Sequence, residues 1–309
     1  MKQLKGIIPP IVTPFNKSEE LDEAALRKQI RFMLDIGVDG VCVGGSTGQG
    51  YTLSLDELRR LVEVTADEVG GKVPIVAGII ANSTYDLIAR AKAVREFNVA
   101  ALQVTPTYYI FKPDDKSILD HFKAVTEAVD IPVIIYNVVR WNILSADLLV
   151  RIFLKVPGVL GVKQSGGEIK LLADLLIYAP KDKLIFTAQD ALLYPSFMIG
   201  AHGSISANAA AVPSACLALW DAVKAGDHEI ALELHKRLLR FWNTITGDNM
   251  PACVKYALSL QGCPSGPPRR PMPDATPEQR ASIKPALKHL LDYVSARAAK
   301  SGGRRAAKK

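Results

Sequence analysis

Residues 132–163 read PVIIYNVVRWNILSADLLVRIFLKVPGVLGVK, and this stretch decides the fold. It opens with one apolar run, Pro132–Tyr136, and closes with another, Val159–Lys163. Between them, Ser145–Lys155 repeats its apolar residues at the spacing of an amphipathic helix. Runs that are apolar at consecutive positions are typical of parallel strands covered on both faces, so the stretch predicts a strand–helix–strand unit.

The same alternation continues on both sides of this unit. The other apolar runs are Gly6–Val12, Gly40–Val43, Pro74–Ala77, Ala100–Val104, Lys183–Thr187 and Gly203–Ser206. The other expected helices are Asp22–Ile36, Ser54–Val69, Ser83–Phe97, Asp115–Val129, Glu168–Tyr178, Ala191–Ile199 and Asn208–Ala225. Eight such units predict an α/β fold of the closed (β/α)₈ or TIM-barrel type. A doubly wound sheet, which usually has fewer units, is the alternative.

After Ala225 the strand-like runs stop. Three further helices are expected, at His228–Thr244, Ala252–Leu260 and Thr276–Ala299, with a connector rich in proline and glycine at Gly262–Pro273. We therefore expect a catalytic barrel over residues 1–225, a C-terminal helical extension over 226–299 and a disordered basic tail over 300–309.

Charge and composition restrict the partners of the protein. Six lysines and arginines between Arg297 and Lys309 account for most of the net charge of +7, so the body offers little support for nucleic-acid binding. The four cysteines show neither disulfide nor zinc spacing, which fits a reducing compartment. The sequence has no signal-peptide core and no apolar run of the ~20 residues that a membrane span needs. We expect a cytoplasmic protein with no membrane or nucleic-acid partner and no metal site.

Lys163 is the most informative candidate for chemistry, because it ends an otherwise apolar run. In (β/α)₈ barrels, active sites lie at the carboxyl ends of the strands. A free lysine, with a pKa of about 10.4, is almost entirely protonated at neutral pH. Burial at a barrel mouth disfavours the ammonium form. A neutral amine can condense with a ketone to an imine that acts as an electron sink. The alternative is a lysine that extends from the strand end to solvent.

Other polar groups follow neighbouring runs. Gly44–Gly48 is a turn whose glycines let the backbone approach a ligand and whose N–H groups can hold a carboxylate; a tight strand–helix loop is the alternative. Tyr108 and Tyr136 follow the fourth and fifth runs, where a phenol can transfer protons or simply pack.

The order and spacing of these groups resemble the dihydrodipicolinate synthase/N-acetylneuraminate lyase family of pyruvate-dependent Schiff-base aldolases. The resemblance extends from Gly6 to about His289. Its most specific motifs are Gly44-Gly45-Ser46-Thr47-Gly48, Val104-Thr105-Pro106-x-Tyr108-Tyr109, Tyr136-Asn137-Val138 and Gly161-Val162-Lys163-Gln164.

The resemblance implies a catalytic set. Lys163 is similar to the Schiff-base lysine of the family, and Tyr136 to the tyrosine that transfers protons at the imine. Ser46 matches the hydroxyl that links this tyrosine to Tyr108, which the family inserts from a neighbouring subunit. The resemblance therefore implies a homotetramer made of two tight dimers. It also implies that no cofactor is needed beyond the covalent imine with the 2-oxo acid.

The resemblance also implies substrate-binding residues. Thr47 matches the residue that binds the pyruvate carboxylate, and the backbone of Ile205 faces the pyruvate pocket. Synthases of the family join pyruvate to aspartate semialdehyde and hold it with an arginine. Arg140 is the candidate for that arginine, as a two-pronged carboxylate clamp, unless it is a surface residue. Trp141 adds an aromatic wall near the mouth that suits a less polar substrate.

Several positions depart from the pattern of the family, and the roles of Gln49, Ala188 and Trp141 stay open. Gln49 replaces the usual glutamate, and Ala188 replaces a common glycine. Ala191 follows Asp190 where sialate lyases usually place an acid, which argues against a sialate lyase.

The expected activity is a pyruvate-dependent lyase or synthase of the 4-hydroxy-tetrahydrodipicolinate synthase type, which condenses pyruvate with an aldehyde. An aldolase for a 2-keto-3-deoxy sugar acid, for N-acetylneuraminate or for an arylidene pyruvate is the alternative. A non-catalytic protein that binds 2-oxo acids on the same scaffold is a more remote one.

Overall fold

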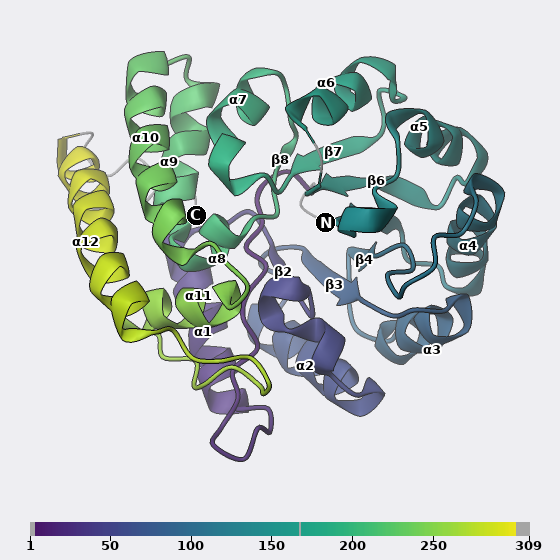
Figure 1. The fold of residues 1–309 in the computed structure, drawn as a ribbon, viewed down its shortest axis with the longest axis horizontal. Coiled ribbons are helices and arrows are strands. Elements are labelled where there is room, and N and C mark those ends of the chain that lie inside the picture. The colour runs from purple at the N-terminus through teal and green to yellow at the C-terminus, as the bar shows by residue number, and fades with distance from the viewer. Residues whose placement is uncertain (1–3, 167, 301–309) are drawn as a thin grey trace.

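The computed structural model describes residues 4–166 and 168–300. Eight parallel strands curl into a barrel in the order β1-β8-β7-β6-β5-β4-β3-β2 (Figure 1). Pro10 pairs in parallel with Cys42 and closes the ring between the two ends of this order. The strands are β1 Gly6–Ile7, β2 Val41–Val43, β3 Ile75–Ile79, β4 Ala101–Val104, β5 Val133–Asn137, β6 Val159–Gln164, β7 Leu184–Thr187 and β8 Gly203–Ser204. The prediction of a (β/α)₈ barrel is confirmed.

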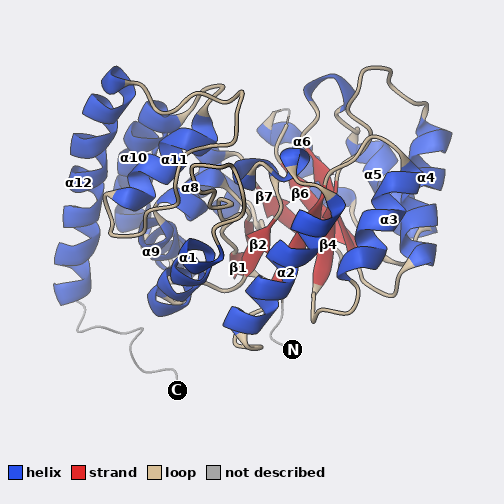
Figure 2. Cartoon of the chain, turned by 90° about the horizontal axis from the view of Figure 1, so that it is seen from below, coloured by secondary structure: helices blue, strands red, loops and turns tan. Residues whose placement is uncertain are grey.

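Helices enclose the strands on the outside (Figure 2). They are α1 Glu23–Ile36, α2 Leu55–Val69, α3 Thr84–Val94, α4 Asp115–Ala128, α5 Ala146–Lys155, α6 Ile169–Tyr178, α7 Leu193–Met198, α8 Ala207–Ala211 and α9 Pro213–Lys224. The helix expected at Asn208–Ala225 is therefore two helices. Pro213 lacks an N–H and occupies the first turn of α9, so one continuous helix cannot pass through this point.

The last three helices, α10 His228–Ile245, α11 Met250–Ser259 and α12 Pro277–Lys300, lie together on one side of the barrel next to α9 (Figures 1 and 2). The division of the chain near residue 225 stays a prediction, and residues 301–309 of the expected basic tail lie outside the described residues. None of the described helices is both long and apolar enough to cross a bilayer.

Apolar side chains form a large core between barrel and helices and a small one inside the barrel. Phe186 belongs to the inner core, and the strand register places Tyr136, Lys163 and Phe186 side by side on β5, β6 and β7. Side chains in register on parallel strands share one face of the sheet, so Lys163 points into the barrel. Two residues earlier, a Cβ on Gly161 would lie 2.0 Å from the Leu184 carbonyl oxygen, so only glycine fits there.

A second lysine, Lys255 on α11, is also buried, with 4% of its surface exposed. Its ammonium donates to the carbonyl oxygens of Ser265, at 3.3 Å, and Pro267, at 2.7 Å, and lies 4.7 Å from the centroid of the Phe15 ring. Burial lowers the pKa of Lys255 from 10.5 to about 7.

This shift predicts how the stability of the protein depends on pH. Between pH 7 and pH 10.5 the unfolded chain holds a proton on Lys255 that the folded chain releases, so unfolding is expected to become harder as pH rises. Below pH 7 both states are protonated, and Lys255 adds no pH dependence. The gain is at most about 1.4 kcal/mol per pH unit.

Urea denaturation at pH 7, 8 and 9 of the native chain and of Lys255→Met checks this expectation. The stability of the native chain should rise relative to that of the variant over this range. Lys116→Met removes an exposed lysine and serves as the control: its free energy of unfolding should differ from that of the native chain by the same amount at each pH. If the difference between Lys255→Met and the native chain is also independent of pH, the prediction is wrong.

Candidate active site

A cavity of about 400 Å³ lies above Lys163 at the carboxyl ends of the strands. Four of the expected site residues, Thr47, Tyr136, Lys163 and Ile205, line it together. Segments that follow four strands, β5 to β8, and the helices α10 and α11 complete the wall with Val138, Ser165, Ala188, Gln189, Asp190, Ala191, Leu192, Ser206, Ala207, Trp242 and Met250. The cavity is therefore in the position where barrels of this class carry their chemistry.

Lys163 is 2% exposed, and its Nζ lies 3.8 Å from the centroid of the Tyr136 ring. This burial excludes the alternative in which the side chain extends to solvent. The face of an aromatic ring attracts a cation. The ring of Tyr136 can thus stabilise the ammonium of Lys163 and, equally, an iminium formed at the same nitrogen.

The turn after β2 continues as a short 3₁₀ helix, Ser46–Gly48. Thr47 is 5% exposed and lines the cavity, whereas Ser46 is only half-buried and does not. The first N–H groups of a helix have no acceptor within the helix, so those of Ser46 and Thr47 are suited to an anion. The Thr13 hydroxyl donates to the carbonyl oxygen of Gly48 at 2.6 Å and fixes the far side of the turn.

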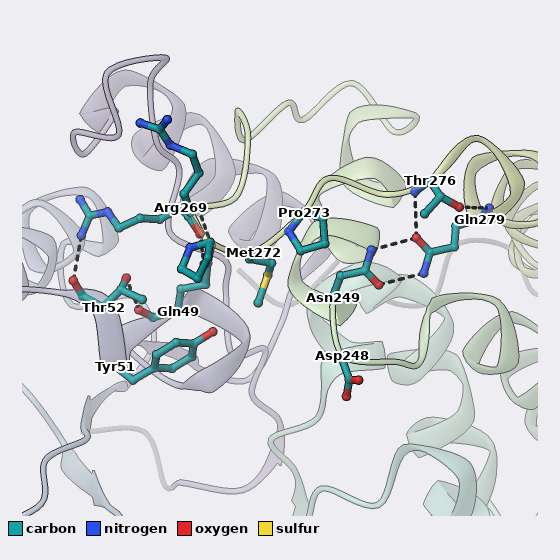
Figure 3. Close-up of a pocket in the computed structure, with 12 residues that line it drawn as sticks. Gln49, Tyr51, Thr52, Asp248, Asn249, Arg269, Met272, Pro273, Thr276 and Gln279 are labelled. Carbon is teal, nitrogen blue, oxygen red and sulfur yellow. Dashed lines mark hydrogen bonds between the residues drawn. The ribbon is translucent and has the colours of Figure 1, made fainter.

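Gln49 joins this turn to the connector before α12, which lies 220 residues further along the chain (Figure 3). Its Nε2 donates to the carbonyl oxygen of Arg269, and the N–H of Arg269 donates to its Oε1, both at 3.0 Å. The guanidinium of Arg269 donates to the Glu57 carboxylate at 2.6 and 3.0 Å and to the Thr52 carbonyl oxygen at 3.0 Å. We call these contacts the Gln49–Arg269 clasp. They assign a structural role to Gln49, which the sequence left open.

Asp190 follows β7, and its carboxylate accepts the N–H groups of Ala207, at 3.2 Å, and Asn208, at 2.6 Å. Burial raises the pKa of Asp190 to about 6, against the opposing effect of these N–H groups and of Lys163. Both oxygens therefore serve to fix the start of α8, directly after Ile205. This role of Asp190 has no signal in the sequence, because its partners follow a different strand.

Three expected site residues do not line the cavity of the single chain. Ser46 is half-buried beside it, Tyr108 is partly exposed on the loop after β4, and Arg140 is exposed. The backbone N–H groups of Tyr108 and Tyr109 donate to Oδ1 of Asn82, at 3.0 and 2.9 Å, and hold this loop in place.

The aromatic wall expected from Trp141 comes from a different tryptophan. Trp141 is 58% exposed and lies outside the cavity wall, whereas Trp242 on α10 and Met250 at the start of α11 line it. No motif marks these two residues in the sequence, because they lie on helices outside the strand–helix repeat.

Two buried polar atoms in the cavity wall have no partner in the described part of the chain. They are Oγ of Ser165 and Nε2 of Gln189, on the loops after β6 and β7. Buried polar groups are normally hydrogen-bonded, so these two atoms are available to a ligand.

Residues 3–290 match the model of the dihydrodipicolinate synthetase family. A 4-hydroxy-tetrahydrodipicolinate synthase of Ralstonia nicotianae is 35% identical over 292 residues, which cover 93% of this chain and 98% of that protein. The structure of dihydrodipicolinate synthase DapA-2 from Bacillus anthracis is 28% identical, with a TM-score of 0.88 over 93% of this chain and 99% of that one. CdNal from Clostridium difficile, solved with mannosamine, is 27% identical, with a TM-score of 0.87 over 93% and 99%.

Proposed function

The chain belongs to the dihydrodipicolinate synthetase family of class I, pyruvate-dependent lyases, and on that premise we propose that it condenses pyruvate with an aldehyde in the manner of the 4-hydroxy-tetrahydrodipicolinate synthases. The observation that carries the proposal is the enclosed amine of Lys163, which is buried at the floor of a cavity large enough for two small substrates.

The chemistry follows from that amine. In its neutral form the Lys163 amine attacks C2 of pyruvate, water leaves, and an iminium forms. Loss of a proton from C3 gives an enamine, whose C3 attacks the aldehyde carbon and forms the new carbon–carbon bond. The aldehyde oxygen takes up a proton. Water then hydrolyses the iminium, which releases a 4-hydroxy-2-oxo acid and restores the amine.

The other expected residues have proposed roles around this reaction. Tyr136 transfers the protons, in a relay with Ser46 and with Tyr108 from a neighbouring copy. The carboxylate of pyruvate binds Thr47 and the N–H groups of its turn, beside the backbone of Ile205. Nζ of Lys163 lies 3.8 Å from the centroid of the Tyr136 ring, and this proximity supports a role for Tyr136 in the reaction.

A homotetramer of two tight dimers is part of the proposal, since a neighbouring copy would supply Tyr108. The segment that follows Tyr108 supports this arrangement, because it exposes apolar side chains in the single chain. Tyr109, Ile110 and Phe111 are 72%, 54% and 84% exposed. A second copy that covered them would remove this apolar surface from water. We propose that the enzyme works in the cytoplasm.

Tyr136→Phe is expected to lower kcat for the condensation by about 10- to 100-fold, because it removes the proposed proton donor and keeps the ring beneath the amine. The KM for pyruvate should change much less. Steady-state kinetics with pyruvate and a fixed aldehyde measure both quantities. An unchanged kcat would remove Tyr136 from the proton relay.

Cleavage of a 2-keto-3-deoxy sugar acid or of a sialate is a second candidate. The free Ser165 hydroxyl and Gln189 amide favour it, because both can bind hydroxyl groups of a sugar. The position after Asp190 argues against a sialate, because Ala191 brings no acid to the cavity.

Incubation with pyruvate and borohydride, followed by peptide mapping, tests the common step. One reduced pyruvate adduct per chain, on the peptide that contains Lys163, is the expected result. An unmodified Lys163 peptide would overturn both candidates. Tight pyruvate binding and an adduct, but no turnover with any aldehyde, would leave only a non-catalytic binding protein.

A further inference from the structure

A glutamine lies inside the barrel, beneath the turn that carries Thr47. Resting on the proposed condensation at Lys163, we propose that Gln103 is a positioning residue for the carboxylate of the 2-oxo acid. Its side-chain amide supports the turn from below and supplies a hydrogen-bond donor that carries no charge. The side chain lies under the described cavity wall and not in it.

The strand register places Gln103 in the interior of the barrel. Successive side chains of a strand point to opposite faces, and Ala101, two residues before Gln103 on β4, belongs to the inner core. On β5, the register neighbour of Gln103 is Ile134, another residue of that core. Gln103 is 0% exposed, so a polar amide is enclosed where barrels of this class usually hold branched apolar side chains.

Two contacts place the amide of Gln103 between β2 and the turn that follows it. Cys42 on β2 donates its thiol hydrogen to Oε1 of Gln103 at 3.7 Å. A Cβ built on Gly45 would lie 3.5 Å from Nε2, so the N–H end of the amide packs against the backbone of Gly45. The amide therefore contacts the turn at the residue directly before its 3₁₀ helix.

Gly45 is the anchor of this turn. Its carbonyl oxygen accepts the N–H groups of Gly48 and Gly50, both at 3.0 Å. A side chain that packs under Gly45 thus helps to fix the position of Thr47, two residues further along the chain. Gln103 acts on the carboxylate site through this backbone.

The N–H group of the amide is free. Nε2 of Gln103 is buried and has no hydrogen-bond partner within residues 4–166 and 168–300. A buried amide without a partner destabilises a fold, and methionine would fill a similar volume without that cost. The free N–H points to an acceptor that arrives with the substrate, which is its carboxylate or a water molecule bound to it.

The absence of charge on Gln103 suits its place near Lys163. Burial raises the pKa of the Cys42 thiol to about 11, and the positive charge of Lys163 opposes this rise. The charge of the lysine therefore acts on the side chain that contacts Gln103. A carboxylate at position 103 would repel the substrate and stabilise the ammonium form of Lys163, whereas a cation would disfavour the iminium. A neutral amide avoids both effects.

Gln103→Met removes the donor and keeps the length of the side chain. We expect the KM for pyruvate to rise about tenfold, with kcat at saturating pyruvate within about threefold of the native value. Urea denaturation should show a variant at least as stable as the native chain, because no buried amide is left unpaired. Gln103→Leu is a second variant with the same expected rise in KM. An unchanged KM in both variants would overturn the inference.

Acetone separates an effect on the carboxylate from a general loosening of the site. It has the carbonyl group of pyruvate and no carboxylate, and borohydride reduces the imine of either ketone. In Gln103→Met, the rate of trapping at low ketone concentration should fall about tenfold for pyruvate and stay within about twofold for acetone. An equal fall for both ketones would overturn the inference, because the variant would then disturb Lys163 itself.

Gln261→Met is the matched control. Nε2 of this partly buried glutamine donates to the carbonyl oxygens of Ala211, at 2.7 Å, and Ala257, at 2.9 Å. The control should lose stability and keep the native KM and both trapping rates. A rise in KM equal to that of Gln103→Met would overturn the inference.

The native chain separates this inference from the proposed function. If it forms no adduct with pyruvate and borohydride, the proposed function fails. If it forms the adduct on Lys163 and the Gln103 variants keep the native KM, the inference about Gln103 alone fails.

Discussion

Lys163→Arg is expected to lower kcat/KM for the condensation by at least about 10³-fold and to abolish trapping by pyruvate and borohydride. A guanidinium stays protonated at all relevant pH values and cannot act as the amine nucleophile. The substitution keeps a long basic side chain at the ring of Tyr136, where Nζ of Lys163 lies 3.8 Å from the centroid. A loss of activity would therefore report on the missing amine and not on a loss of side-chain volume.

Two other lysines provide the controls for this experiment. Lys183 directly precedes β7, at the opposite end of the barrel, and its side chain is 10% exposed, so Lys183→Arg tests the effect of the same exchange away from the cavity. Its kcat/KM should stay within about twofold of the native value, as for substitutions away from the site. Lys255 is buried, and its pKa is lowered to about 7, so it tests whether amine reactivity alone is sufficient. An adduct on the Lys255 peptide, or residual activity of Lys163→Arg near the native level, would contradict the mechanism.

The barrel and its reactive lysine could be predicted because both depend on local sequence. A strand between barrel core and helices is apolar at consecutive positions, so runs such as Val159–Lys163 stand out from the helices around them. The position of Lys163 at the end of such a run is sufficient to place it at the mouth of the barrel. The proline at position 213 also marks, in the sequence, the break between α8 and α9, although the apolar pattern conceals it.

The second half of the site could not be predicted, because it depends on contacts between distant segments. Trp242 and Met250 reach the cavity only because α10 and α11 pack beside the barrel, and their spacing is that of ordinary core residues. Asp190 looks like a strand-end acid until its partners, the N–H groups after β8, are known. The role of Gln49 depends on a segment 220 residues away, and no local pattern indicates it.

The Gln49–Arg269 clasp connects that distant segment to the turn that carries Thr47. Arg269 has a side chain that is 13% exposed, and it contacts the carboxylate of Glu57, the Thr52 carbonyl oxygen and the face of Phe15, whose centroid lies 4.2 Å away. A buried ion pair that loses one partner costs roughly 3–5 kcal/mol. Since Glu57 is 31% exposed, we expect Arg269→Met to lower the free energy of unfolding by less, about 2–3 kcal/mol.

The neighbouring arginine is a matched control for this variant. The side chain of Arg270 is 82% exposed, and its ion pair with Glu19 is open to solvent, so Arg270→Met should lower the free energy of unfolding much less than Arg269→Met does. Urea denaturation of both variants and of the native chain gives the comparison. Equal losses in the two variants would show that the clasp contributes no more than a surface ion pair.

The pH dependence of the stability lost in Arg269→Met identifies the cause of that loss. The hydrogen bond from Arg269 holds the pKa of Glu57 below its usual 4.5. The unfolded chain therefore takes up a proton on Glu57 at a higher pH than the folded chain does. The stability from this pair is complete above about pH 4.5 and is lost as pH falls through the lowered folded value. The gap between the native chain and Arg269→Met should thus narrow below pH 4.5, and a gap that stays constant would point to lost packing on Phe15 instead.

The same variant should change pyruvate binding and leave the chemistry of the lysine intact. Gln49 has a left-handed conformation, at a φ of 52°, and its side chain bonds the backbone N–H and carbonyl oxygen of residue 269, which the variant keeps. The variant removes the guanidinium contacts to Glu57 and Thr52, which hold this part of the connector in place beside the turn. A looser turn positions Thr47 and its N–H groups less well, so the KM for pyruvate should rise several-fold while borohydride trapping at saturating pyruvate still reaches one adduct per chain. A rise in KM for Arg269→Met but not for Arg270→Met would show that the C-terminal connector positions the carboxylate site. A KM unchanged in both variants would confine the clasp to stability.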